Sequence, residues 1–370
     1  MAFDPVRVGL IGCGTISKIY LENAPKFGVF EVIACADIVL ERAEARAKEF
    51  AVPKASTPDE LLANPDVELV INLTIPAAHA EVATGALDSG KNVYSEKPLS
   101  TDRISGRELL ALGEAKGLRI GCAPDTFLGG GIQTVRKLID DGLIGEPVAA
   151  TAFMLGHGPE SWHPDPVFYY QSGAGPMFDM GPYYLTTLVN LIGPIARVTG
   201  ATRVTFPERT ITSLPKFGTK ITVTTPTHIA GLIEFSTGAI GTIVTSFDVW
   251  PTDLPKIEIY GTEGSLGIYD PNLFGGPIRL RRPGSKEWED VTLTHGSIVN
   301  SRGLGPADLA IGLRLNRPHR ASGELSYHVL DVMQAFFDSA AEGRRIEIQS
   351  SCERPASLQA GLADFQLATD

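Results

Sequence analysis

The feature that most constrains the fold is a glycine-rich turn between an apolar, strand-like run at 6–12 and a helical pattern at 16–24. The turn reads Gly12-Cys13-Gly14-Thr15-Ile16-Ser17, a GxGxxS pattern. Glycines in such a turn let the backbone approach a pyrophosphate, and the free amides of the following helix stabilise its charge. Alone the pattern is weak, because an ordinary glycine turn before a helix has the same letters.

The alternation of strand and helix continues through the first third of the chain. The predicted strands are 6–12, 31–36, 69–73, 92–95 and 119–122, and the predicted helices are 16–24, 38–50, 78–89 and 101–116. Short, continuously apolar strands that are each followed by a helix indicate a parallel sheet covered on both faces. We therefore predict an α/β Rossmann domain with a doubly wound parallel sheet over residues 1–124.

Longer β-type stretches dominate the remainder, residues 125–370. After a helix at 132–141, the predicted strands are 148–155, 196–205, 220–225, 227–235, 239–247, 256–260 and 265–268. Gly238 and Gly264 stand where hairpin turns are expected. The pattern predicts a substrate-binding and oligomerisation α+β domain with a large, mostly antiparallel open sheet.

The wide sheet of this second domain needs a cover. Helices predicted near 178–192 and 324–342 are candidates, and the last helix can instead pack back on the Rossmann domain. A second subunit is the other candidate, so we expect a homodimer or homotetramer.

Composition excludes several function classes. The formal net charge of -11 argues against nucleic-acid and anionic-membrane partners, which require a concentrated basic surface. No secretory leader and no apolar run of ~18 residues is present, so we expect a cytoplasmic protein with reduced thiols. The four cysteines form no CxxC pair, and no HExxH or HxH motif occurs, so no metal site is expected.

Asp37 strengthens the dinucleotide interpretation. It lies at the end of the second predicted strand, 20 residues beyond Ser17, where a carboxylate accepts hydrogen bonds from the adenine ribose hydroxyls. A helix-capping aspartate is the alternative reading. Because Ile38 follows, rather than an arginine or serine that would bind a 2′-phosphate, NAD is favoured over NADP.

Four segments taken in order carry a family resemblance: the glycine turn, the tripeptide Glu96-Lys97-Pro98, residues 173–181 and the turn at 260–264. Over nearly its whole length the chain resembles the Gfo/Idh/MocA family, which includes glucose-fructose oxidoreductases and inositol dehydrogenases. The resemblance implies a Rossmann domain followed by an α/β domain whose open sheet commonly packs against another subunit.

The resemblance implies that Lys97 lies beside the nicotinamide and that Pro98, often preceded by a cis bond, holds it in place. The residues themselves agree, since a lysine at the C-terminal end of a parallel strand points into the ligand crevice. There its ammonium can stabilise alkoxide character on the reacting oxygen. The alternative is an exposed lysine before a helix-starting proline.

The family also has a catalytic aspartate followed four residues later by a histidine. Here these positions are Asp179 and Tyr183, and a spacing of four places both on one helical face. A tyrosine with an ordinary pKa near ~10 needs help as an acid or base, which the Lys97 ammonium can supply by lowering that pKa. Tyr183 is therefore a candidate proton-transfer group; a binding or packing role for Tyr183 and a structural role for Asp179 stay open.

A polar and aromatic stretch, 162–170, suits a sugar, because apolar ring faces stack on aromatic side chains while His and Asp bind hydroxyls. His163 is a second candidate general base, although the loop could equally pack onto the second domain. His79 is a possible cofactor contact or a local cap. The expected cofactor contacts are Gly12, Gly14, Thr15, Ile16, Asp37, Thr74, Pro76, His79, Glu96, Lys97 and Trp162.

The cluster Arg317, His319 and Arg320 precedes the last predicted helix. It could contact an anionic substrate or a neighbouring subunit, but a solvated helix entry is favoured.

Three functions follow from these features. The first is NAD-dependent oxidation or reduction at a secondary hydroxyl of a sugar, glycoside or cyclic polyol. The second is glycoside hydrolysis, in which tightly held NAD oxidises the sugar transiently, elimination breaks the glycosidic bond and the hydride returns. The third is a non-enzymatic dinucleotide sensor, which retention of Lys97 and Asp179 disfavours.

Overall fold

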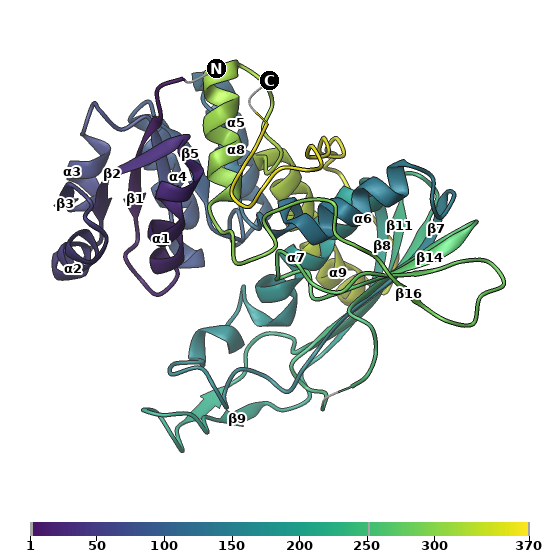
Figure 1. The fold of residues 1–370 in the computed structure, drawn as a ribbon. Coiled ribbons are helices and arrows are strands. Elements are labelled where there is room, and N and C mark those ends of the chain that lie inside the picture. Colours follow the sequence, from purple (N-terminus) through teal and green to yellow (C-terminus); the bar gives the residue numbers. More distant parts are fainter. Residues whose placement is uncertain (1–2, 251, 369–370) are drawn as a thin grey trace.

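The computed structural model describes residues 3–250 and 252–368, and its N-terminal half confirms the predicted parallel sheet (Figure 1). In this part of the chain six strands pair in the order β3-β2-β1-β4-β5-β6, all parallel. They are β1 (Val6–Ile11), β2 (Phe30–Ala36), β3 (Lys54–Ser56), β4 (Leu69–Asn72), β5 (Asn92–Ser95) and β6 (Ile120–Cys122). The strand order reverses between β1 and β4, since β2 and β3 lie on one side of β1 and β4 to β6 lie on the other; doubly wound sheets bind ligands at this point.

Helices cover both faces of this sheet. They are α1 (Ser17–Phe27), α2 (Leu40–Phe50), α3 (Pro58–Leu62), α4 (His79–Asp88) and α5 (Arg103–Lys116). β3 and α3 were not among the predicted elements because each is too short for a periodic pattern. The start of α3 does have a sequence signature, a capping box in which the side chains of Thr57 and Glu60 each accept from the other's backbone amide.

The second half builds the predicted wide sheet. Nine strands of the described ranges pair in the order β16-β15-β14-β13-β7-β12-β11-β8-β17. They are β7 (Pro147–Leu155), β8 (Ile195–Arg203), β11 (His228–Phe235), β12 (Ile240–Ser246), β13 (Ile257–Gly261), β14 (Gly264–Ile268), β15 (Arg279–Arg281), β16 (Glu289–Asp290) and β17 (Ile346–Glu347). Pairing is antiparallel except between β7 and β12, so the sheet is mostly antiparallel, as predicted.

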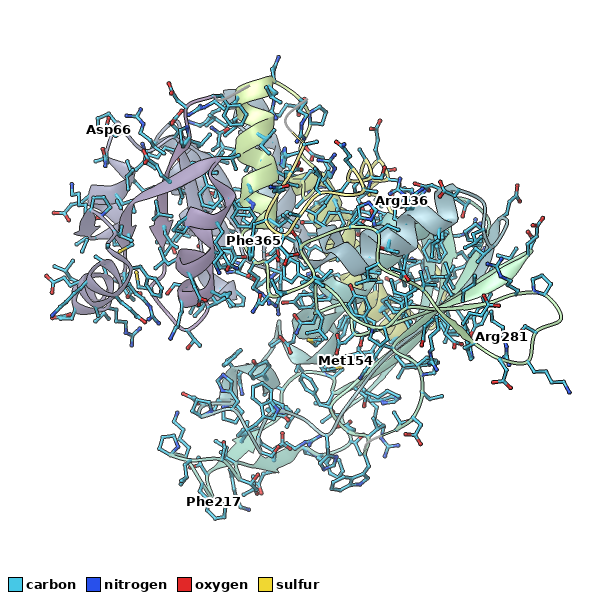
Figure 2. The ribbon with its side chains drawn as sticks, in the orientation of Figure 1. Asp66, Arg136, Met154, Phe217, Arg281 and Phe365 are labelled. Atoms are coloured by element: carbon cyan, nitrogen blue, oxygen red, sulfur yellow. The ribbon has the colours of Figure 1, made fainter. Side chains whose placement is uncertain are left out.

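The predicted strand at 220–225 lies outside that sheet. Only β10 (Lys220–Thr222) forms, and it pairs with β9 (Glu208–Thr210) in a small lobe that projects from the body (Figure 1). Phe217 lies at the tip of this lobe (Figure 2). The lobe also carries the aromatic stretch at 162–170, so we treat it below as part of the candidate site.

Two long helices, α7 (Gly175–Ile192) and α9 (Gly323–Glu342), cover one face of the wide sheet, which is one of the two covers considered for it. Phe336 of α9 packs so closely that a Cβ at Gly231 would lie 2.4 Å from its ring. The opposite face carries Leu232 and Ile240 in exposed positions. An oligomer that covers this face stays a prediction.

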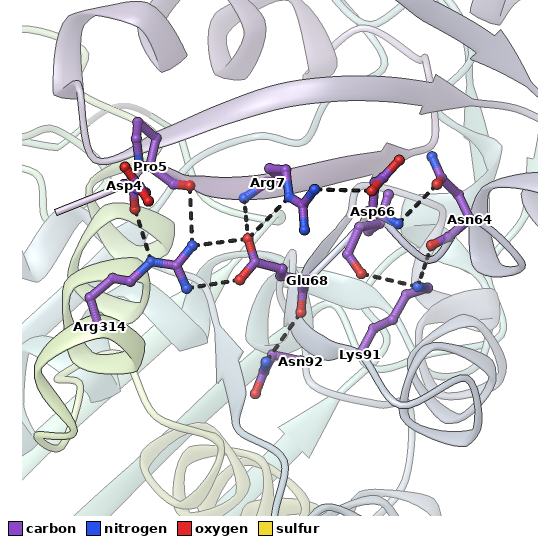
Figure 3. Close-up of polar contacts among 10 residues, drawn as sticks. Asp4, Pro5, Arg7, Asn64, Asp66, Glu68, Lys91, Asn92 and Arg314 are labelled. Carbon is purple, nitrogen blue, oxygen red and sulfur yellow. Dashed lines mark hydrogen bonds and ion pairs between the residues drawn. The ribbon is translucent and has the colours of Figure 1, made fainter.

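Helices α6 (Gly130–Asp140) and α8 (Leu304–Leu315) complete the second half, and α8 was not predicted. It crosses back to the first sheet, where the Arg314 guanidinium pairs with both carboxylate oxygens of Glu68, at 2.8 and 2.9 Å (Figure 3). α9 likewise lies against α5. The division of the chain at residue 124 stays a prediction.

The segment before α9 corrects one expectation. Arg317 and Arg320 both pair with Asp308 of α8, whose side chain is fully buried, at 2.9 and 2.5 Å. A ring nitrogen of His319 lies 2.9 Å from the Ile120 carbonyl oxygen. The prediction of a solvated helix entry was therefore wrong, because a buried carboxylate is stable only when it is paired.

None of the helices in residues 3–250 and 252–368 combines the length and apolar character that a bilayer crossing requires.

Candidate active site

The glycine turn has the shape that a pyrophosphate requires. Gly12 has φ +101°, and a Cβ there would lie 2.6 Å from the backbone of Leu73, so only glycine fits. A Cβ at Gly14 would meet nothing within 4 Å, which leaves open space beside the turn. α1 begins without a side-chain cap and without an acidic residue in its first turn, so no capping side chain or carboxylate of that turn competes with an anion for its N-terminal amides. The turn therefore fits a dinucleotide.

Asp37 is fixed at the edge of this turn. Its Oδ2 accepts from the Cys13 amide and its Oδ1 accepts from the Val39 amide, both at 2.9 Å. The carboxylate is thus oriented before any ligand arrives, and each oxygen keeps a second lone pair for a ribose hydroxyl. Asp37 also acts in part as a helix cap, the alternative role, because the Val39 amide that it binds lies immediately before α2.

Arg46 is a cation near the turn that sequence reasoning missed. Its Nε donates to Ser17 Oγ at 3.1 Å, and its Nη2 donates to the Gly14 carbonyl oxygen at 3.3 Å. Arg46 also pairs with Glu49. Arg46 lies within α2, nine residues after Asp37, whereas a cation that binds a 2′-phosphate is expected immediately after Asp37, so no local motif indicated it.

Lys97 follows the C-terminal end of β5 and meets α7. Its Nζ donates to Asp179 Oδ1 at 2.9 Å and to the Asp179 carbonyl oxygen at 2.6 Å. The two side chains are 17% and 25% exposed, so the pair is largely shielded from water. Burial lowers the pKa of Lys97, but Asp179, Tyr183 and Glu96 together raise it above its ordinary value. The Lys97 side chain is therefore a charged ammonium with a fixed position. The Lys97–Pro98 peptide bond is cis, as the resemblance implied.

Tyr183 joins this pair one turn after Asp179. Lys97 Nζ lies 5.3 Å from the centroid of its ring, and the side chain is buried. Burial raises the pKa of Tyr183, and the opposing effects of Lys97 and Arg302 do not overcome it. Lys97 lowers the pKa of Tyr183, as expected. The pKa is nevertheless raised overall, because desolvation of a phenolate is the larger effect.

Glu96 connects the lysine turn to the cofactor helix. Its Oε1 accepts from the Tyr20 hydroxyl of α1 at 2.8 Å, and its Oε2 accepts from the Lys97 amide at 3.0 Å. Tyr20 is almost fully buried. Glu96 therefore fixes Lys97 relative to the helix that begins at the glycine turn.

Thr74, Pro76 and His79 lie at the end of β4, on the same edge of the sheet. Thr74 Oγ1 donates to Asn72 Oδ1 at 2.7 Å, and Pro76 opens a short 3₁₀ helix, Pro76–Ala78. The two ring nitrogens of His79 lie 2.7 Å from the Pro98 carbonyl oxygen and 3.0 Å from that of Thr74. Burial lowers the pKa of His79. This geometry favours the local-support reading of His79 over a direct cofactor contact.

The aromatic stretch reaches the site through Tyr169. Burial, followed by the Asp179 charge, raises the pKa of Tyr169 to about 12. His163 packs on Tyr169 with ring centroids 5.3 Å apart, and its Nδ1 accepts from the Asp165 amide at 3.0 Å. Trp162 is 65% exposed, and its ring centroid lies 6.4 Å from that of Tyr169. His163 thus contacts Tyr169, and Tyr169 is the group on which the Asp179 and Lys97 charges act, which makes His163 the weaker candidate base.

A buried ion cluster holds this stretch in the lobe, and sequence reasoning missed it. Arg209 is 5% exposed and donates to Glu160 Oε1 at 2.6 Å and to Asp248. Tyr170 donates to the other oxygen of Glu160. The partners come from widely separated segments, so no sequence spacing indicates the cluster. Among the described residues, no group of three or more His, Cys, Asp or Glu side chains could hold a metal.

Comparison with known proteins agrees with this geometry. A family model described as "Oxidoreductase family, NAD-binding Rossmann fold" matches residues 6–123, and one described as "GFO/IDH/MocA C-terminal domain" matches residues 132–267. The chain is 26% identical over 306 residues to a 1,5-anhydro-D-fructose reductase of Ensifer adhaerens, covering 82% of this chain and 84% of that protein.

Two further similarities are partial or limited to the fold. The chain is 31% identical over 155 residues to an inositol 2-dehydrogenase/D-chiro-inositol 3-dehydrogenase of Lacticaseibacillus casei; the match covers 40% of this chain and spans 44% of that protein. The solved structure of a levoglucosan dehydrogenase in complex with NADH and levoglucosan superposes with a TM-score of 0.81 at 20% identity, over 94% of this chain and all of that one.

Proposed function

This chain belongs to the Gfo/Idh/MocA family of oxidoreductases, and from that membership we propose that it interconverts a secondary hydroxyl and a ketone on a sugar, glycoside or cyclic polyol, with NAD as the cofactor. The observation that carries the proposal is the Lys97–Asp179–Tyr183 cluster, which lies at the sheet edge shared with the glycine turn. The names of the anhydrofructose reductase and inositol dehydrogenase relatives support the substrate class.

The proposed cofactor preference, oligomeric state and cellular location each rest on a different observation. The orientation of Asp37 supports NAD over NADP. The exposed face of the wide sheet supports a homodimer or homotetramer. Cytoplasmic location rests on composition and on four unpaired cysteines.

The chemistry assigned to the chain is proton handling and charge stabilisation. A bound nicotinamide dinucleotide would accept or supply the hydride. Lys97 donates a hydrogen bond to the substrate oxygen and stabilises its partial negative charge, while Asp179 keeps the ammonium charged and aimed. Tyr183 holds its proton at neutral pH, because burial raises its pKa. It therefore enters the reducing direction as the acid that protonates the substrate oxygen. The oxidising direction is the reverse step, in which the hydroxyl proton passes to the phenolate form, whose population increases with pH.

The test is incubation with NAD or NADH and a panel of sugars, polyols and aryl glycosides. Absorbance of NADH and the identity of the carbohydrate product are followed together. We expect NADH to form or disappear in equal amount with a ketone or alcohol product. Release of aglycone without net NADH would replace the proposal with the hydrolase mechanism. If no member of the panel reacts with either cofactor, in the wild type or in Lys97→Ala, the sensor function is the correct one.

A further inference from the structure

We propose that Arg209 and Glu160 are positioning residues for carbohydrate recognition, because they fix the two ends of the aromatic loop, residues 161–169. This inference rests on the proposed function and deepens it. The loop suits a sugar, since its aromatic rings offer apolar faces for stacking while His163 and Asp165 offer hydrogen-bonding groups. A loop already fixed in its binding position loses little conformational entropy when the substrate arrives, so its position affects how tightly a carbohydrate binds.

Glu160 joins the two ends of the aromatic loop. It lies immediately before the loop, and its Oε2 accepts from the hydroxyl of Tyr170, which lies immediately after it. Tyr170 is fully buried and Glu160 is 8% exposed, so water competes little for this hydrogen bond. The Glu160 carbonyl oxygen also accepts from the Thr212 and Ser213 amides, at 2.9 and 3.0 Å, which attaches the start of the loop to the lobe.

Arg209 of β9 holds the Glu160 carboxylate in place. Its Nη1 donates to Glu160 Oε1 at 2.6 Å and to the His157 carbonyl oxygen at 3.1 Å. Its Nη2 donates to the Phe247 carbonyl oxygen at 2.7 Å and to Asp248 Oδ1. Because both terminal nitrogens are bonded, the planar guanidinium has one orientation, and that orientation fixes the carboxylate of Glu160.

The charges of this cluster make its geometry costly to disturb. Arg209 pairs with both Glu160 and Asp248, whose side chains are 11% and 4% exposed. Two hydroxyls complete the bonding, since Tyr170 donates to Glu160 and Thr227 donates to Asp248. A buried carboxylate is stable only while its partners stay in place, so displacing Tyr170, and with it the end of the loop, is unfavourable.

The end of the fixed segment packs against the helix that carries two of the proposed catalytic residues. The short 3₁₀ helix η3 (Val167–Tyr170) contacts α7, on which Asp179 and Tyr183 lie. Trp162 and Phe168 of the loop nevertheless stay 65% and 49% exposed. The ion cluster therefore holds exposed aromatic rings in fixed positions, which is the arrangement that stacking on a sugar requires.

The test uses two variants that keep the lobe packed. Tyr170→Phe removes the hydrogen bond to Glu160 but keeps the buried ring, and Arg209→Lys keeps the charge but loses the planar fork. For the panel member with the highest kcat/KM, we expect KM to rise about tenfold in each variant, because the freed loop must be ordered on binding. We expect kcat and the dissociation constant for NADH to stay close to the wild-type values. Glu208→Gln breaks the exposed Lys220–Glu208 pair of the same lobe and is the matched control, which should leave KM unchanged.

A purely structural cluster would give a different pattern of kinetic constants. Partial unfolding of the lobe reduces the concentration of active enzyme, so kcat falls while KM keeps its wild-type value. That pattern overturns the inference. A rise in the dissociation constant for NADH that equals the rise in KM also overturns it, because the loop would then position the cofactor instead of the carbohydrate.

A second readout does not depend on turnover. In the Trp250→Phe/Trp288→Phe background, Trp162 is the single tryptophan of the chain and reports on the loop. Tyr170→Phe should lower the residual fluorescence anisotropy of Trp162 on the nanosecond timescale, whereas Glu208→Gln should not change it. If the anisotropy falls while no carbohydrate reacts, the hydrogen bond does fix the loop and the proposed function is what fails. An anisotropy that Tyr170→Phe leaves unchanged overturns the inference.

Discussion

Lys97 Nζ donates both to the side chain and to the backbone carbonyl of Asp179, at 2.9 and 2.6 Å, across the junction between β5 and α7. The backbone bond fixes the ammonium even when the carboxylate moves. A cation held in this way needs little reorganisation when charge develops on a substrate oxygen, which is the condition for strong electrostatic stabilisation.

Lys97→Met should therefore reduce kcat/KM by about 10²- to 10³-fold. The dissociation constant for NADH, measured by fluorescence, should stay close to the wild-type value, because the glycine turn is untouched. Lys116→Met removes a lysine from a surface ion pair with Asp88 and is the matched control. Loss of NADH binding in Lys97→Met, with no separate loss of kcat, would show that the lysine has a structural role instead.

Asp37 should determine the cofactor preference. In Asp37→Asn the KM for NAD should rise about tenfold, since a hydrogen bond to a charged acceptor is replaced by one to a neutral amide. The KM for NADP should fall, because the repulsion between a carboxylate and a 2′-phosphate is removed. Initial rates with both cofactors measure the ratio.

A wild-type enzyme that prefers NADP would contradict the Asp37 prediction. In that case Arg46, which lies within reach of Gly14 and Ser17, is the cation to replace next, by Arg46→Ala.

The predictable parts of the site share one property: their signals are local. The glycine turn, the strand end at Lys97 and the four-residue spacing of Asp179 and Tyr183 are each contained within a few positions of the chain. The ion cluster of Arg209, Glu160 and Asp248 was not predictable, because its members come from segments far apart in the sequence. The longer strands were predictable by the same reasoning, whereas strands of two or three residues such as β3 and β9 were not. The pairing of β10 with β9 was also not predictable, since pairing depends on which edges the tertiary fold brings together.

Asp125 should make the protein less stable as pH rises through the weakly acid range. Burial raises its pKa to about 6 in spite of the Gly305 and Gly303 amides that donate to it. A carboxyl whose folded pKa is above its unfolded value of 3.8 binds its proton more tightly in the folded state. Its stabilising effect is thus greatest below pH 4 and is lost by about pH 6, a change of about 3 kcal/mol.

Urea unfolding of the wild type and of Asp125→Asn tests this effect of Asp125. The stability of the wild type relative to the variant should fall between pH 4 and 6 and be constant above that range. A difference that does not change with pH would mean that Asp125 titrates normally in the folded protein.

The ion pair between Glu68 and Arg314 should stabilise the return of α8 to the first sheet (Figure 3). The Arg314 guanidinium donates to both oxygens of Glu68, and the Arg7 amide donates to one of them. Because of Arg314, and despite partial burial, the pKa of Glu68 is lowered to about 2. The contribution of Glu68 to stability is therefore complete above pH 4.5 and is lost as pH falls toward 2.

Glu68→Gln should lower the free energy of unfolding by about 1 kcal/mol at pH 7, a value discounted because both side chains are partly exposed to water. The deficit should shrink as pH falls below 4.5. The control is Glu289→Gln, which breaks the Arg282–Glu289 pair, where both side chains are 52% exposed. That variant should change stability by less than about 0.5 kcal/mol. If the two variants lose the same amount, the bidentate geometry at Glu68 adds nothing to an ordinary surface pair, and packing of the apolar face of α8 alone holds that helix on the sheet.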